Sequence, residues 1–436
     1  AERRTGPEED VMDPEAGRPP DPGTRIGRAD GELSRPRLLV VGLQHMFVMF
    51  GATVLVPILT GLDVAVALFA SGVGTLLFHV VTRFRMPVYL GSSFAFIPPI
   101  IAVAEAGSLA QATGAIILAG LLYTAVSLAL RFVEPRSIYR WVPPHVTGPI
   151  IILIGLMLAP VAVANAGGAN SPGIRSAAAW GLALVTLGAG VVVKVWFRRW
   201  GYPFLATLPV LAGLVVGYAA AAVAGAVDVA PVAEADWYGL PAFMAPELNV
   251  RAVTLLVPVA LVTMIEHLGD VLAIGEVVDQ DFIEDPGLHR TLLGDGLATA
   301  LAGALGAPAN TTYSENTGAV ALTGVRAPVV MRVAAVGALV LSLVPKFSAV
   351  IASIPLPVVG GISVLLFGMI AGIGIKSLVD HRVDLGDPKI LIIVSTMLVL
   401  GLGDAQGAVG PVELSGLALA AVVGILGNAV LPGTDH

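Results

Sequence analysis

The sequence predicts an all-α polytopic membrane protein with fourteen transmembrane segments, arranged as two inverted repeats of seven segments each. Composition is the first observation behind this prediction. Of the 436 residues, 56% are hydrophobic and 13% are charged, whereas soluble domains carry about 25% charged residues. The second observation is a series of apolar runs close to the roughly 20 residues that a spanning helix needs. The third is an internal repeat.

The chain opens with a polar region over residues 1–36, rich in Pro, Gly, Asp, Glu and Arg. This composition cannot bury a core, so we expect a disordered tail, and the tail lacks the basic-then-apolar order of a signal peptide. Apolar segments separated by charges, prolines and glycines follow. They cover 38–60, 63–82, 86–104, 108–131, 145–164, 177–196, 203–226, 251–275, 291–305, 309–322, 327–344, 347–373, 388–404 and 412–431.

Lysine and arginine concentrate in every second connection between these segments. If the tail is cytoplasmic, the inner connections hold residues such as Arg83, Arg198 and Arg290. The outer ones hold little beyond Arg175, Lys346 and Arg251. Basic residues favour the cytoplasmic side of a membrane. The distribution therefore predicts an even number of segments with both termini in the cytoplasm.

An internal repeat relates the two halves at an offset of 222 residues. Because each half then holds an odd number of segments, the halves must cross the bilayer in opposite directions, as in many secondary transporters. The matched positions are Gln44-His45 with Glu266-His267, Gly72 and Gly74 with Gly294 and Gly296, and Ser92-Ser93 with Ser314-Glu315.

The third and tenth segments are interrupted by prolines, glycines and polar residues. β-Favouring residues predict short extended strands at Val88-Tyr89-Leu90 and Asn310-Thr311-Thr312-Tyr313. Each strand is followed by a half-helix that begins near Ser93 or Ser314. Two half-helix ends at mid-membrane would offer backbone donors, hydroxyls and a positive dipole end. Together with flat apolar faces from Phe94 and Tyr313, they favour a planar heterocycle as the ligand.

Carboxylates also stand in this apolar setting, where ionisable groups usually mark a binding site or an ion pathway. Glu315 follows the interruption of the tenth segment, and Glu266 lies inside segment 251–275. Asp270 is four residues after Glu266 and shares its face on a helix. Two such carboxylates in a low dielectric cannot both stay ionised, so one should carry a proton, as a proton-coupled carrier requires.

Several function classes are disfavoured by the sequence. It has no cysteines, and its seven histidines show no metal-ligand spacing, so we expect neither a metal site nor a cofactor. No Walker-type GxxxxGK[ST] motif and no nucleophile–base pair is present, which argues against an ATP-driven pump and against an enzyme. We expect no nucleic-acid partner. A secondary transporter is favoured, and an uncoupled, channel-like pore is the alternative from another class.

At this point the chain resembles the nucleobase–ascorbate transporter family (nucleobase:cation symporters), and within it the branch of bacterial proton-coupled uracil permeases. The resemblance covers about residues 38–431. It rests on five motifs taken together: Gln44-His45, Tyr89-Leu90-Gly91-Ser92-Ser93-Phe94-Ala95-Phe96, Glu266-His267-Leu268-Gly269, Asn310-Thr311-Thr312-Tyr313-Ser314-Glu315-Asn316-Thr317-Gly318, and Pro355-Leu356-Pro357-Val358-Val359-Gly360-Gly361.

The resemblance implies proton-coupled import of a nucleobase across the inner (plasma) membrane by a homodimeric carrier. A Glu at position 315 is typical of the uracil branch, and xanthine or another purine is the alternative substrate. The family fold also implies that a core domain moves against a gate domain. The core would comprise 38–131 and 251–344, and the gate 145–226 and 347–431.

The site residues also follow from the resemblance. Glu266 and Glu315 would hydrogen-bond the base. The implied substrate contacts are Glu266, Glu315, Ser93, Phe94, Tyr313 and Ser314. The implied proton-coupling residues are Glu266, Asp270 and His267, with Phe367 as a gate residue.

Other roles for the same residues stay open. Asp270 stands where some uracil permeases have His, so a structural hydrogen bond is as good an expectation for it as proton transfer. On a helix His267 points about 100° away from Glu266, which suits packing or support of the site. The aromatic residues Phe94, Tyr313 and Phe367 would also serve as ordinary packing groups.

Overall fold

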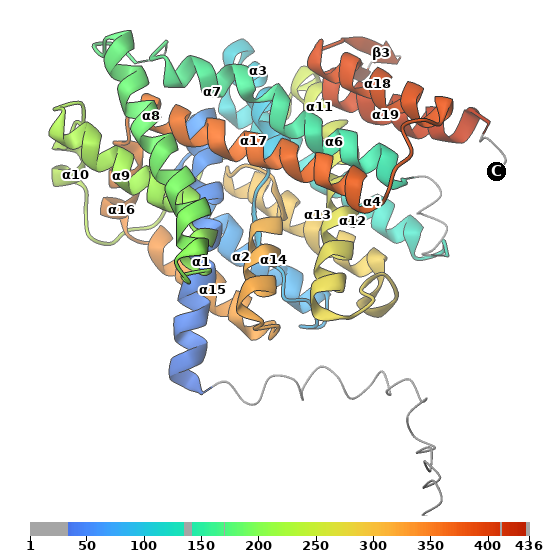
Figure 1. The fold of residues 1–436 in the computed structure, drawn as a ribbon, viewed down its shortest axis with the longest axis horizontal. Coiled ribbons are helices and arrows are strands. Elements are labelled where there is room, and N and C mark those ends of the chain that lie inside the picture. Colours follow the sequence, from blue (N-terminus) through green and yellow to red (C-terminus); the bar gives the residue numbers. More distant parts are fainter. Residues whose placement is uncertain (1–33, 135–141, 170, 410–411, 433–436) are drawn as a thin grey trace, which may run out of the picture.

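The computed structural model shows a protein built almost entirely of helices (Figure 1). The residues that it describes are 34–134, 142–169, 171–409 and 412–432. The predicted tail, 1–36, lies outside the described residues except at its end, where helix α1 already begins at Arg35. Pro36 in the first turn suits this start, because its fixed φ is helical and the N–H it lacks would be unpaired there.

The described residues form a series of helices with four short strands among them. The first half contains α1 (Arg35–Thr60), α2 (Val64–Val81), β1 (Leu90–Ser92), η1 (Phe94–Phe96), α3 (Ile97–Ala106), α4 (Leu109–Leu130), α6 (Pro144–Met157), α7 (Ala159–Ala166), α8 (Ser176–Val192), η3 (Val193–Phe197), η4 (Leu205–Thr207) and α9 (Pro209–Val223). The second half contains α10 (Ala230–Glu234), α11 (Val250–Leu256), α12 (Val259–Val278), η5 (Ile283–Gly287), α13 (Leu288–Leu305), β2 (Asn310–Thr312), α14 (Ser314–Thr323), α15 (Val329–Ser342), α16 (Pro345–Ala352), α17 (Leu356–Asp380), α18 (Pro388–Leu402), β3 (Gly407–Val409), β4 (Val412–Leu414) and α19 (Gly416–Val430). Here η1 and η4 are 3-10 helices, and η3 and η5 are π-helical turns.

Among the described residues, seven helical stretches are long and apolar enough to cross a membrane. An eighth results if α15 and α16, which are bent by 86° at their junction, count as one span. Shorter apolar helices include α9, α18 and α19. The chain is thus a multi-pass membrane protein, and the count of fourteen segments stays a prediction.

The predicted continuous segment 347–373 is wrong. The chain forms two helices there, because α16 ends at Ala352 and α17 begins at Leu356. Pro355 lies between them, and a residue that precedes a proline is pushed out of the helical region. The last predicted segment, 412–431, likewise opens as strand β4 before α19 begins.

The helices pack in two groups. In the first, α13 packs on α2 and α4, and α15 packs on α1 and α2. In the second, α17 packs on α6, α7 and α8, while α18 packs on α19 and α6. Figure 1 shows orange α17 running alongside green α6, with the red pair α18 and α19 together at one edge. The division into a core and a gate, and their relative movement, remain predictions.

The two interrupted segments meet in a short antiparallel crossing of β1 and β2. The paired residues are Leu90 with Thr312, Gly91 with Thr311, and Ser92 with Asn310. Two further backbone bonds extend the crossing, from Ser93 N to Ala309 O (2.8 Å) and from Tyr313 N to Tyr89 O (3.0 Å). An extended piece is confirmed in each segment, but the first lies at Leu90–Ser92 and not at the predicted Val88-Tyr89-Leu90. The helical starts are confirmed at Phe94 for η1 and at Ser314 for α14.

A tyrosine ring closes over the centre of this crossing. The Tyr313 hydroxyl donates to the carbonyl oxygen of Ser92 (3.0 Å). Its ring lies directly against Gly91, where a Cβ atom would overlap the ring atoms. Glycine at position 91 is therefore required by the close approach of the ring to the strand backbone.

The order of elements recurs between the two halves. The series α1, α2, β1, α3 and α4 has its counterpart in α12, α13, β2, α14 and α15. Leu90 and Thr312, which are 222 residues apart, pair directly with each other in the antiparallel crossing. An antiparallel crossing is what two halves of opposite direction would form, and this supports the predicted repeat.

We predict that Gly91→Ala destabilises the folded protein by about 1–3 kcal/mol, because the added methyl group forces the hydrogen-bonded Tyr313 ring out of place. The measurement is the thermal midpoint of the purified protein in detergent. Gly181→Ala in α8 is the matched control, since a Cβ at position 181 meets no atom within 4 Å. Equal midpoints for the two variants would contradict the role assigned to Gly91.

Candidate functional site

Ser93 and Phe94 lie where strand β1 passes into η1. Ser93 is fully buried, and its Oγ atom has no hydrogen-bond partner among the described residues. The Phe94 ring meets the ring of Phe367 from α17 edge to face, with 5.9 Å between the centroids and 77° between the planes. The structure thus brings the predicted gate residue into contact with a predicted substrate residue, across the boundary between the two groups of helices.

Ser314 and Glu315 form the first turn of α14. The positive end of the helix dipole favours a carboxylate at this position. Both residues line a cavity of about 370 Å³, which has further walls from α1, α17 and the stretch from η3 to α9. Two lysines, Lys194 and Lys376, also line this cavity.

The carboxylates predicted from the sequence come close together in space. Glu266 and Asp270 lie on α12, and Glu266 interacts electrostatically with both Asp270 and Glu315. Oε2 of Glu266 is buried without a hydrogen-bond partner among the described residues. One oxygen of Asp270, in contrast, accepts a hydrogen bond from the Thr312 hydroxyl (3.0 Å).

His267 belongs to a buried polar network on another face of α12. Its Nε2 atom lies 3.0 Å from Oγ1 of Thr291. Its Nδ1 atom lies 3.4 Å from Oγ1 of Thr312 and 3.5 Å from Oδ2 of Asp295. His267 therefore reaches Asp270 through the Thr312 hydroxyl, a relation that the sequence does not reveal.

Asp295 and Lys194 were not predicted from the sequence as candidate site residues. Asp295 is fully buried beside His267, and neither of its carboxylate oxygens has a hydrogen-bond partner among the described residues. Both residues are charges inside predicted spans, 291–305 and 177–196, so the argument that singled out Glu315 would have found them.

The Tyr313 side chain packs against the strand crossing and hydrogen-bonds to it. Its hydroxyl donates to Ser92 and lies 3.3 Å from Oγ1 of Thr53, and only 3% of the residue is exposed. Its ring therefore supports Gly91, and a contact between this ring and a ligand stays a prediction.

A smaller cavity of about 130 Å³ lies on another part of the boundary between the two groups of helices. Phe94 borders it together with Pro98 and Pro99, while Asp404 and Ser415 come from the other group. Phe94 thus borders one cavity, while Ser314 and Glu315 border another. Glu266, Ser93 and Tyr313 are not among the lining residues of either cavity.

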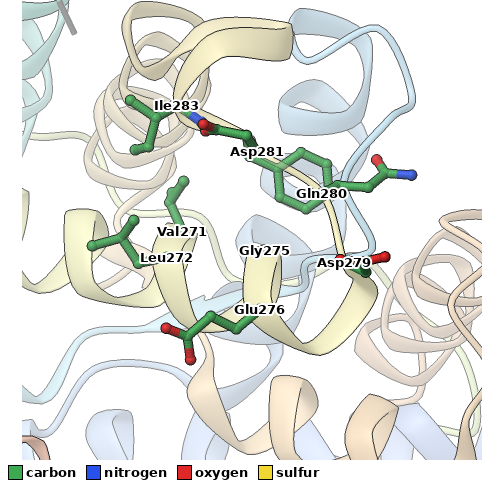
Figure 2. Close-up of a pocket in the computed structure, with 9 residues that line it drawn as sticks. Val271, Leu272, Gly275, Glu276, Asp279, Gln280, Asp281 and Ile283 are labelled. Atoms are coloured by element: carbon green, nitrogen blue, oxygen red, sulfur yellow. The ribbon is translucent and has the colours of Figure 1, made fainter. Parts of the chain in front are cut away.

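The end of α12 forms a separate acidic pocket of about 320 Å³. Figure 2 shows the carboxylates of Glu276, Asp279 and Asp281 standing on different sides of it. Asp281 accepts from the backbone N–H of Ile283 (2.9 Å) and so stabilises the local turn. Within the described ranges, no group of three or more His, Cys, Asp or Glu residues is arranged to hold a metal ion. We therefore assign no second binding site to this pocket.

Solved structures with a similar fold include two transporters. The transmembrane domain of a cyanobacterium bicarbonate transporter, BicA, matches with a TM-score of 0.65 at 17% identity, covering 88% of this chain and 96% of that one. The murine anion transporter Slc26a9 in its inward-facing state matches with a TM-score of 0.71 at 14% identity, covering 92% and 69%. At these identities the likeness concerns the fold alone.

Some proteins share a higher sequence identity with this chain than these two transporters do. A uracil permease of Bacillus caldolyticus is 46% identical over 403 residues, which cover 91% of this chain and 92% of the relative. A uracil permease of Escherichia coli (strain K12) is 40% identical over 405 residues, again covering 91% and 92%. A putative pyrimidine permease of the same strain is 39% identical over 415 residues, covering 92% and 91%.

The family model described as "Permease family" matches residues 36–410. This match includes both interrupted segments and all the predicted site residues. The relatives are permeases, that is, transporters rather than enzymes. On the strength of this match and these identities, the chain belongs to the Permease family.

Proposed function

We propose that this protein is a proton-coupled symporter that imports uracil. The observation that carries the proposal is its 46% and 40% identity to two uracil permeases, each over 91% of the chain. The geometry of the site adds physical support, because it leaves hydrogen-bonding groups free where a base would bind.

Two buried polar atoms at the site lack partners. They are Oε2 of Glu266, an acceptor when ionised, and Oγ of Ser93, which donates or accepts. A buried polar group without a hydrogen bond costs about 1–3 kcal/mol. A pyrimidine with alternating N–H and carbonyl edges would supply both partners. Binding of the base would remove the free-energy cost of the two unpaired groups and so be favoured over an empty site.

Glu315 is the second base-binding carboxylate in this proposal, and the aromatic residues complete the site. Glu315 lies at the start of α14 beside Ser314 and faces a cavity large enough for a single ring. The face of Phe94 would stack on the base, while Phe367 packs against the Phe94 ring from the gate side. Tyr313 would contribute through its place in the crossing.

Proton coupling would use the carboxylates of α12. Glu266 and Asp270 are four residues apart, and both interact electrostatically with Glu315. Three negative charges in one low-dielectric site repel one another, so a proton on Glu266 or Asp270 would stabilise the loaded carrier. His267 would support this site by holding the Thr312 hydroxyl against Asp270.

Transport would proceed by movement of a core against a gate. The two cavities at the boundary between the helix groups support this view, because Phe94 borders one and Glu315 borders the other. We propose fourteen spans in two inverted repeats, with the termini in the cytoplasm, the carrier in the inner membrane, and a homodimer as the assembly.

The substrate prediction is tested by radiolabelled uracil uptake in cells that lack their own uracil carrier and express this chain. We expect excess unlabelled uracil to abolish the signal and excess xanthine to leave it nearly unchanged, because a Glu at position 315 is typical of the uracil branch. Uptake that xanthine suppresses and uracil does not would overturn the substrate assignment.

The coupling prediction concerns Glu266→Gln, measured as uptake into proteoliposomes driven by an acid-outside gradient. We expect the initial rate to fall about tenfold to hundredfold, since a charge-assisted hydrogen bond is worth about 1.5–3 kcal/mol and the exchangeable proton is also lost. Glu276→Gln on the same helix is the matched control, because its exposed side chain lies at the end of α12. Undiminished proton-driven uptake in Glu266→Gln would remove Glu266 from the mechanism.

A further inference from the structure

A lysine of one helix group and a carboxylate of the other line the same cavity. Lys194 lies in η3, the π-helical turn that continues α8. Glu315 lies in the first turn of α14. Both border the cavity of about 370 Å³, and their charges interact electrostatically. The cavity thus brings opposite charges of the proposed gate and the proposed core into electrostatic attraction.

The charges around Glu315 make this lysine distinctive. On the core side, Glu315 interacts electrostatically with the carboxylates of Glu266 and Asp270, which repel it. Of the two lysines that line the cavity, Lys376 already forms an ion pair with Asp380 on its own helix. Lys194 is therefore the cavity lysine available to Glu315.

The local backbone offers a second, independent observation. Helix α8 leaves its regular α-helical hydrogen bonding over Val193–Phe197 and forms a single π-helical turn. Such turns are rare and occur often at functional sites. This one places Lys194 within the distorted segment, where the cavity wall passes from α8 towards η4 and α9.

We propose that Lys194 is a positioning residue that competes with the bound base for the carboxylate of Glu315 and so promotes release of the base into this cavity. The inference rests on the proposed function, in which Glu315 binds the base. The ring N–H groups and the lysine ammonium are donors for the same carboxylate oxygens. A lysine whose charge attracts Glu315 therefore weakens the binding of the base on this side of the carrier.

The exposure of Lys194 fits a release role. Its side chain is exposed and lines the cavity, so its attraction to Glu315 is partly screened by solvent. A contact of this strength shifts the affinity for a base without locking the two helix groups together. For an importer in the proposed orientation, the cavity on this side is the one into which the base is released.

The experiment compares Lys194→Met, Lys194→Arg and Lys376→Met with the unmodified protein. Equilibrium binding of uracil is measured on the purified proteins, and KM and maximal rate are measured in proteoliposomes. We expect Lys194→Met to bind uracil about twofold to fivefold more tightly, the effect of a partly exposed ion pair. Its maximal rate should fall, because release slows. Lys194→Arg and Lys376→Met should match the unmodified protein.

Two outcomes overturn the inference while the proposed function stands: unchanged or weaker uracil binding by Lys194→Met, or the same behaviour in Lys194→Arg as in Lys194→Met. Failure of the unmodified protein to bind uracil, in contrast, overturns the proposed function itself.

A labelling measurement covers the case in which Lys194→Met fails to fold. The chain has no cysteine, so Lys194→Cys introduces a single thiol. We expect bound uracil to change its rate of modification by a soluble maleimide, with no such change in Lys376→Cys. A rate at position 194 that is independent of uracil contradicts the inference.

Discussion

The antiparallel crossing of β1 and β2 is the constraint on which the site depends. Lipid offers no hydrogen bonds, so backbone that leaves a helix inside a membrane must find its partners within the protein. Each strand supplies backbone hydrogen-bond partners to the other. Buried hydroxyls add further bonds: Ser71 donates to the Leu90 carbonyl (2.7 Å), and Thr299 donates to the Asn310 carbonyl (2.8 Å). Two helices can therefore start at the centre of the protein, with Ser93 and Ser314 at their ends.

The crossing also organises the charged side chains around it. Thr312 is the last residue of β2 and donates to Asp270 on α12, so the strand fixes one of the carboxylates by a single hydroxyl. Glu266, one turn earlier, keeps a buried oxygen without a partner among the described residues. Of these two carboxylates, therefore, Asp270 has a hydrogen-bond donor within the protein, and Glu266 keeps an oxygen available to a ligand or a proton. This asymmetry suggests distinct roles for two residues that the sequence presents as equivalent.

Local chemistry made much of this site predictable from the sequence, and tertiary contacts explain the rest. The presence of an extended piece in each segment and the helix start at Ser314 follow from local residue preferences, so they were predicted correctly. The proximity of Lys194 to Glu315 joins residues more than a hundred positions apart and leaves no local pattern. The break at Pro355 was readable, but the continuous apolar composition of 347–373 outweighed it. The packing of the Tyr313 ring against Gly91 is also a tertiary contact. It was not predicted, because the motif shows an aromatic residue and not what that residue packs against.

The position of Glu315 also bears on what the site can bind. The start of a helix is favourable for an anion, because the unpaired N–H groups and the dipole both present positive charge there. In this chain a carboxylate of the protein already occupies that place on α14. An anionic ligand would meet the charges of Glu315 and Glu266 together, whereas a neutral ring with N–H donors would be attracted by both. In the proposed function, the same arrangement of broken helices would therefore favour a neutral donor, through the one residue that follows Ser314.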